Sequence, residues 1–137
     1  MPIALAFAAL MQTAAPDSAQ PSVLGQWRSP GGNSIISIAA CGASLCGTVA
    51  WASAKAKQDS SKVIDHLVGT QLLTALQQDR KGVWRGKLFI PDKNMRVTAK
   101  IERVSDQQLK VSGCAAGRAL CKSALWTRTG EPLPASD

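Results

Sequence analysis

Few residues in this chain are of the types that most often carry out chemistry. Its 137 residues include one histidine, His66, which lies in a polar stretch where a lone histidine is most often simply exposed. Asp59, Asp65 and Asp92 suit loop and turn positions, and nothing marks any two of them as a catalytic pair. Gly-rich phosphate loops, H-E-x-x-H and G-x-S-x-G are all absent. We therefore expect no catalytic residues, no resident metal and no cofactor.

The four cysteines fall into two local pairs, Cys41 with Cys46 and Cys114 with Cys121. Each pair flanks a short Gly-containing segment, as across the end of a β-hairpin, where Cα atoms can approach the roughly 5.5–6 Å typical of disulfides. Four cysteines allow three pairings, of which the local one is favoured. A zinc site is the alternative, although the second spacing exceeds the usual C-x₂₋₄-C range. Two disulfides would leave no thiol nucleophile and predict a periplasmic or secreted protein.

The beginning of the chain also favours export. Met1–Ala15 is apolar and ends in small residues, like the h-region and cleavage site of a secretory signal, with Thr13 and Ala15 at the small positions. The alternative is a buried N-terminal helix. The apolar segment is shorter than the ~20 residues needed to span a bilayer, so we do not expect a membrane-spanning protein.

Short apolar runs separated by turn residues predict an all-β fold. Leu67–Gln78 is ambiguous, because its leucines fit either a helical stripe or a strand with Leu72 and Leu76 on one face. The polar turn that follows favours a strand. The predicted strands are Val23–Ser29, Ser34–Ala40, Leu45–Trp51, Leu67–Gln78, Val83–Ile90, Met95–Val104, Gln108–Cys114 and Cys121–Arg128.

Eight strands joined mostly by hairpin turns predict a small closed antiparallel up-and-down barrel, since closure removes unpaired edges. Ala52–His66 is a long polar loop that we interpret as a lid or portal with one helical turn, or else as a solvated insertion. The predicted organisation is a signal peptide and tail over 1–22, one barrel domain over 23–129 and a C-terminal tail over 130–137.

The four tryptophans each lie on a different predicted strand. Trp27 and Trp126 are interpreted as structural, and Arg128 would stack on Trp27 and close one end of the barrel. Trp51, placed on the same face as Val49, adjoins the long loop. The predicted ligand contacts are Trp51, Trp84 and Met95.

Basic residues dominate the charge of the chain, which is +7 with a pI of about 9.6. This charge favours an acidic protein or an anionic lipid surface as a partner, or it only keeps the protein soluble. Nucleic acid is not expected, because exposed aromatics are not interleaved with the basic residues. Four basic residues alternate on two adjacent predicted strands and would form one patch: Arg85, Lys87, Arg96 and Lys100.

Two resemblances follow from these motifs. Gly25-x-Trp27 with Arg128 resembles the lipocalin (calycin) signature, in which the Trp and a late Arg close the barrel floor and the open end takes a lipophilic ligand. From Leu24 to Arg128 the chain is more similar to a family of small secreted bacterial proteins described as a domain of unknown function. The matching motifs are GQW, C-x₄-C-G from Cys41, W-x-G from Trp84, Pro91-Asp92 and the closing W-T-R from Trp126.

The second resemblance implies a lipocalin-like barrel and an exported location, and no established activity. Ile90 and Met95 depart from its pattern, which often has an aromatic before the Pro-Asp and a Gly with Tyr after it. The function we expect is therefore binding of a small lipophilic or amphipathic molecule. The alternative is a protein-interaction module, such as an inhibitor of a secreted or cell-wall enzyme, which would have a filled interior.

Overall fold

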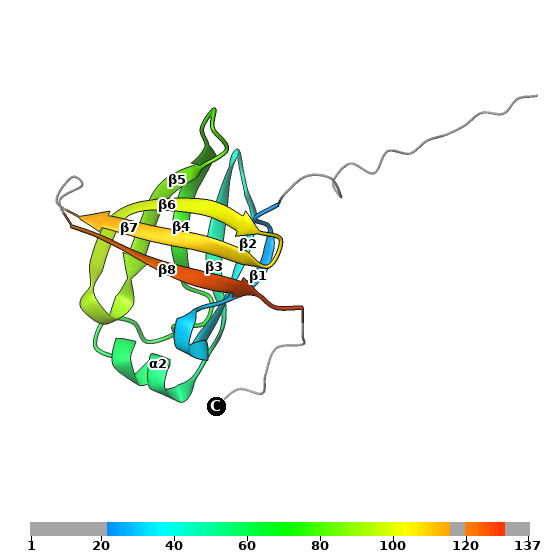
Figure 1. Cartoon of the computed structure of the whole chain (residues 1–137). Helices are drawn as coiled ribbons and strands as arrows, with labels where there is room; N and C mark the ends of the chain where they lie inside the picture. The colour runs from blue at the N-terminus through cyan, green and yellow to red at the C-terminus, as the bar shows by residue number, and fades with distance from the viewer. Residues whose placement is uncertain (1–21, 116–119, 131–137) are drawn as a thin grey trace, which may run out of the picture.

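The computed structural model describes residues 22–115 and 120–130. The signal peptide and tail predicted over 1–22 lie outside the described residues except for Ser22, and the C-terminal tail predicted over 130–137 does so except for Gly130. The described strands form a closed antiparallel barrel in which neighbours in sequence pair and β1 pairs with β8, as predicted (Figure 1). The strands are β1 (Gly25–Arg28), β2 (Ser34–Cys41), β3 (Ser44–Ala52), β4 (Gln71–Gln78), β5 (Trp84–Ile90), β6 (Met95–Ser105), β7 (Gln108–Ala115) and β8 (Leu120–Arg128).

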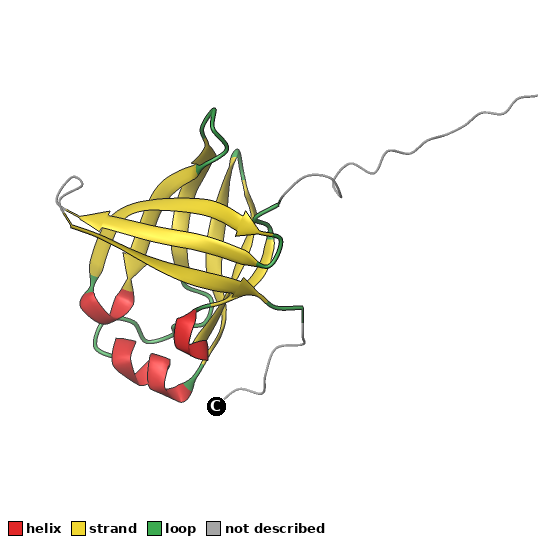
Figure 2. Ribbon diagram, in the orientation of Figure 1, coloured by secondary structure: helices red, strands yellow, loops and turns green. Residues whose placement is uncertain are grey.

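Three short helices lie together at one end of the barrel (Figure 2). They are η1 (Pro30–Gly32), α2 (Ala54–Ser60) and η2 (Pro91–Lys93). α2 begins in the predicted long loop, where the hydroxyl of Ser53 caps it by accepting a hydrogen bond from the Ala56 backbone N–H at 3.1 Å. A helix was expected there, but α2 runs for seven residues, nearly two turns, where a single turn was predicted. It contacts η2 across the end of the barrel.

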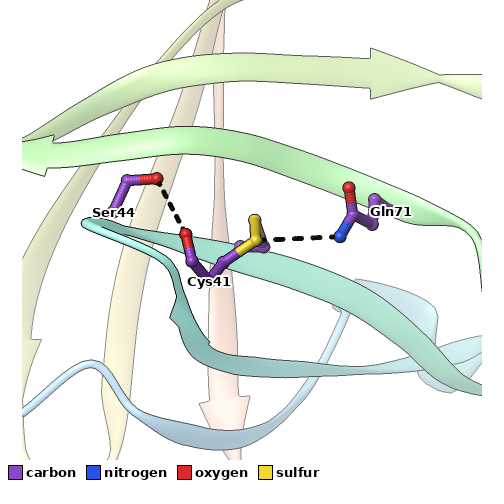
Figure 3. Close-up of a disulfide and its surroundings, with 4 residues drawn as sticks. Cys41, Ser44 and Gln71 are labelled. Atoms are coloured by element: carbon purple, nitrogen blue, oxygen red, sulfur yellow. Dashed lines mark hydrogen bonds between the residues drawn. A yellow bond between two sulfur atoms is a disulfide. The ribbon is translucent and has the colours of Figure 1, made fainter.

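Both disulfides have the predicted local pairing. Cys41–Cys46 brackets the β2–β3 turn with its Cα atoms 5.6 Å apart, and the side-chain nitrogen of Gln71 on β4 lies 3.9 Å from Cys41 Sγ (Figure 3). Cys114 and Cys121 are direct cross-strand partners on β7 and β8. Two disulfides indicate an oxidising, extracytoplasmic location.

β4 carries a bulge that the sequence pattern did not predict. Ala75 adopts a left-handed conformation with φ of 54°, and the pairing of β4 shifts register around it. As a result Leu73 and Leu76, three residues apart, are both fully buried in the core. Leu73, which regular alternation would place on the face opposite to Leu76, therefore joins Leu76 in the core, while Leu72 is partly buried and packs against the same core. The leucine spacing that resembled a helix reflects the inserted residue.

The bulge also explains the glycine of the W-x-G motif. A Cβ atom at Gly86 would collide with the backbone carbonyl of Thr74 and with Ala75, which lie across the β4–β5 pair. Only glycine lets the two backbones approach this closely.

A second bulge, in β3, changes the orientation of Trp51. Ile35 pairs with Trp51 while the next residue, Ile36, pairs with Val49, so that Ala50 is the extra residue. Because paired residues share a face of the sheet and neighbours alternate, Trp51 lies with Ile35 on the face opposite to Val49. The prediction that Trp51 and Val49 share a face is wrong for this reason.

The core fills one part of the barrel interior. Most of its side chains come from inward positions of β1 to β4 and from the middle of β6 and β7. Its fully buried large members are Trp27, Ile36, Ile38, Val49, Leu73, Leu76, Ile101 and Leu109.

Candidate functional site: an apolar cavity at the barrel mouth

Arg128 closes one end of the barrel. Its guanidinium carbon lies 4.2 Å from the ring centroid of Trp27, whose indole N–H donates to the carbonyl of Val23 at 2.9 Å. Gly25 lies beneath it, since a Cβ there would be 2.8 Å from Arg128 Nη1. The same guanidinium donates three hydrogen bonds to backbone carbonyls: Nε to Asp106 at 2.7 Å, Nη1 to Leu24 at 2.9 Å and Nη2 to Ser22 at 2.9 Å.

The predicted stacking of Arg128 on Trp27 is thereby confirmed. These bonds join the start of β1, the β6–β7 turn and the end of β8, which lie beside one another in Figure 1. The G-x-W and W-T-R motifs thus form a closure at this end of the barrel.

A cavity of about 510 Å³ lies toward the other end, among β5, β6, β7 and β8. Its inner part is formed by Trp126, Val111 and Leu88, which are core residues or pack on the core. Its mouth is formed by the end of β5, by η2, by the end of β7 at Ala115 and by the start of β8 at Leu120. The lining residues are Leu88, Ile90, Lys93, Met95, Val97, Val111, Gly113, Ala115, Leu120, Cys121, Lys122, Ser123, Ala124 and Trp126.

The pairing register accounts for this lining. Trp126, Ala124, Lys122 and Leu120 alternate along β8 and pair with Leu109, Val111, Gly113 and Ala115 of β7. Leu109 and Trp126 are buried in the core, so the whole alternating set faces the interior. Small residues at three of these positions, Gly113, Ala115 and Ala124, leave the space that large side chains occupy elsewhere in the barrel.

The mouth combines apolar and basic side chains. Met95 is 40% exposed and Leu120 is 67% exposed, although both belong to the cavity lining. Among the described residues of the lining, Lys93 and Lys122 are the charged ones and none is acidic. The cavity is therefore apolar inside and positive at its opening.

The sequence predicted only part of this site. Met95 lines the cavity, and so does Ile90, the other position that departs from the pattern of the resembling family. Trp84 faces inward near the closed end, where it pairs with Ile101 and packs on the core. Neither Trp84 nor Trp51 belongs to the lining. Trp126, interpreted as structural, is 7% exposed and contributes both to the core and to the cavity.

The pairing register places the four basic residues of β5 and β6 on one face of these two strands. Arg85 pairs with Lys100 across the two strands, and Arg96 stacks on Phe89, 4.4 Å from the ring centroid. Two of the charges have acidic neighbours, because Arg85 contacts Asp79 at 3.1 Å and Lys100 lies 3.9 Å from Glu102. The patch is therefore less positive than its basic residues alone suggest.

A smaller cavity of about 190 Å³ lies between α2, η2 and the barrel. It is more polar and is lined in part by Asp59 and Asp92. His66 lies on the exposed loop beyond α2. Across the described ranges, no group of three or more His, Cys, Asp or Glu residues is placed to hold a metal ion. No helix within those ranges is long and apolar enough to cross a membrane.

Comparison with known proteins gives one family. Residues 25–128 match the family described as "Uncharacterized protein conserved in bacteria (DUF2147)". No curated protein and no solved structure matches the chain significantly. The matched range begins at Gly25 and ends at Arg128, which are the two ends of the barrel and two members of its closure.

Proposed function

The chain belongs to the DUF2147 family, and from that premise we propose that it is an exported, non-catalytic carrier or sensor that binds a small lipophilic or amphipathic molecule inside its barrel. The observation that carries this proposal is the apolar cavity of about 510 Å³. Small-molecule sites commonly occupy about 300–1,000 Å³ and are lined mainly by apolar side chains with a few polar groups. The residues proposed to contact the ligand are Met95, Val97, Val111, Ala124 and Trp126.

The arrangement of the barrel supports a binding role. Arg128 closes one end with three hydrogen bonds and a stacking contact, while the other end has an opening lined by Met95 and Leu120. One closed and one open end is also what the resemblance to lipocalins implies. The interaction-module alternative expects a filled interior, which the cavity argues against.

The two disulfides support a periplasmic or secreted location for this role. Cys114–Cys121 joins β7 to β8 beside the mouth, and it would hold the hairpin ends in place in a compartment where thiols are oxidised. A carrier located there would meet apolar molecules that have left a membrane and need protection from water.

A neutral fluorescent probe tests the proposal. We expect N-phenyl-1-naphthylamine, which emits strongly only in apolar surroundings, to bind the wild-type protein with saturation at one site. Ala124→Phe should weaken this binding at least tenfold, because the ring would enter the cavity beside Val111. Leu125→Phe is the matched control, since Leu125 is the exposed neighbour on the outer face of β8.

The outcomes are distinct. Loss of binding in Ala124→Phe with an unchanged thermal transition, and retention in Leu125→Phe, supports the cavity as the site. If Ala124→Phe fails to fold, Ala115→Phe at the mouth serves the same purpose. Equal binding by wild type and a folded cavity-filling variant would overturn the proposal, as would no binding by wild type.

A further inference from the structure

The cavity is apolar along its walls and positively charged at its mouth, and this combination specifies its ligand more narrowly. Resting on the proposed function, we infer that the cavity takes a single-chain amphiphile with an anionic head group, and that Lys93 and Lys122 bind that head. The chain would lie along the apolar walls toward Trp126. The head would remain at the opening.

Lys122 occupies a position that strand alternation assigns to the interior. It lies between Leu120 and Ala124 on the inward face of β8 and opposite Gly113 on β7. The other members of the alternating inward set on these two strands carry no polar side chain, so the lysine at this position is an exception. Because its partner is glycine, no side chain on β7 fills the space in front of it. A lysine there can lay its methylene stem on the apolar wall and hold its ammonium group at the opening.

Lys93 approaches the mouth from a different element. It ends η2, a turn fixed by the left-handed Asn94 with φ of 49° and by the Asn94 backbone N–H, which donates to the carbonyl of Pro91 at 3.1 Å. Two lysines from separate parts of the chain, the β5–β6 connection and β8, thus contribute to one opening.

Neither lysine is neutralised within the described part of the chain. The ion pairs there involve Lys55, Arg85, Lys100 and Arg103, and none of the described lining residues is acidic. Both ammonium groups are therefore available to a ligand. An anionic head would form charge-assisted hydrogen bonds with them, a cationic head would be repelled, and a neutral head would gain little.

The cavity size sets the number of chains. About 510 Å³ equals roughly seventeen water molecules at ~30 Å³ each. A methylene group is about as large as a water molecule, so this space corresponds to about seventeen methylene groups, which is enough for one twelve-carbon chain and too little for two. The ligand class is therefore a fatty carboxylate or an alkyl phosphate, which share an anionic head on one chain.

Competition against the neutral probe tests this inference. Dodecanoate, dodecyl phosphate, dodecanol and dodecyltrimethylammonium share one chain length and differ in the head. We expect the better anion to displace the probe about tenfold more effectively than dodecanol, the effect of two partly exposed charged contacts. Of the two anions, the one that competes better identifies the head as carboxylate or phosphate. The preference should decline in high salt, because the lysines are exposed.

Substitution of Lys93 and Lys122 tests whether these two residues cause the preference for anionic head groups. Lys93→Gln and Lys122→Gln should each reduce the preference for the anion, and the double variant should lower it to under about threefold, with dodecanol affinity unchanged. Lys110→Gln is the control, because Lys110 is an exposed lysine that pairs with Glu102 and Leu125, away from the cavity lining.

The results separate this inference from the proposed function. The inference alone would be overturned if the probe binds in the cavity but anions compete no better than dodecanol. It would also be overturned if the preference for anions survives the double substitution. Absence of cavity-dependent probe binding would overturn both.

Discussion

Replacing Arg128 with lysine tests how the barrel is closed. The guanidinium makes three hydrogen bonds, of 2.7, 2.9 and 2.9 Å, to one carbonyl in the β6–β7 turn and two in the segment before β1. It also stacks on Trp27. A lysine keeps the positive charge, but its single ammonium group can reach at most one of these carbonyls and cannot stack as a plane.

The expected loss follows from these contacts. Two lost hydrogen bonds contribute about 0.5–1.5 kcal/mol each, and the stacking contact contributes about 0.5–2 kcal/mol. Together they lower the free energy of unfolding by about 1.5–5 kcal/mol. For a domain of this size that change corresponds to a fall in Tm of about 6–20 °C.

Thermal unfolding followed by circular dichroism, with both disulfides intact, measures the effect. Arg103→Lys is the matched control, because Arg103 contacts the same β6–β7 turn through an ion pair with Asp106 at 3.5 Å. The Asp106 side chain is 83% exposed. An exposed pair of this kind contributes about 0–1 kcal/mol. The reasoning fails if Arg128→Lys unfolds within about 2 °C of wild type, or if the two substitutions are equally destabilising.

Two further predictions concern single residues. Ala75→Gly should leave the free energy of unfolding unchanged or raise it by up to about 1 kcal/mol, because glycine relieves the left-handed backbone of the β4 bulge. The control is Ala39→Gly, at an exposed position of β2, which should lower the free energy of unfolding by about 0.5–1 kcal/mol. If urea unfolding shows that both substitutions lower it, this account is contradicted. The pKa of Asp79 is lowered from its ordinary value of 3.8, first by the hydrogen bond from the Val83 backbone N–H and then by Arg85 and Lys81. Its carboxylate therefore stabilises the folded protein at pH values above 3.8. This stabilisation is lost as the pH falls through the lowered pKa. Asp79→Asn should therefore be less stable than wild type at neutral pH and equally stable once Asp79 is protonated, and a difference that persists in acid would show that the carboxylate charge is not the cause.

The barrel was predictable because its signals are local. Turn clusters, period-two alternation and two short-range cysteine pairs each specify a hairpin independently of the rest of the chain. Closure was predictable from one pair, Trp27 and Arg128, because a stack between first and last strands requires that they be neighbours.

The bulges were not predictable from the same signals. Ala75 is an ordinary L-residue in a left-handed conformation, and nothing in its type marks it. The nearest signal was Gly86, whose missing side chain admits the bulge of the neighbouring strand. The bulge at Ala50 likewise moved Trp51 to the face opposite Val49.

The sequence predicted a ligand cavity inside the barrel, but most of the residues that line it could be identified only from the structure. Tryptophan type alone favoured Trp51 and Trp84, whereas the lining depends on which strands have small inward residues. Lys122 carried a usable signal, since it interrupts the alternation that runs back from Trp126 through Ala124. Lys93 carried none, because a lysine in a Pro-Asp turn is ordinary, and only the fold brings it to the mouth.

Native mass spectrometry of the protein purified from a bacterial periplasm tests the central claim most directly. We expect the wild-type protein to retain an added mass that disappears on denaturation and corresponds to a single-chain anionic amphiphile, and we expect Ala124→Phe purified in parallel to lack it. A ligand-free wild-type mass that remains unchanged after incubation with dodecanoate and dodecyl phosphate, or an adduct equally abundant in the folded Ala124→Phe variant, would contradict binding in this cavity.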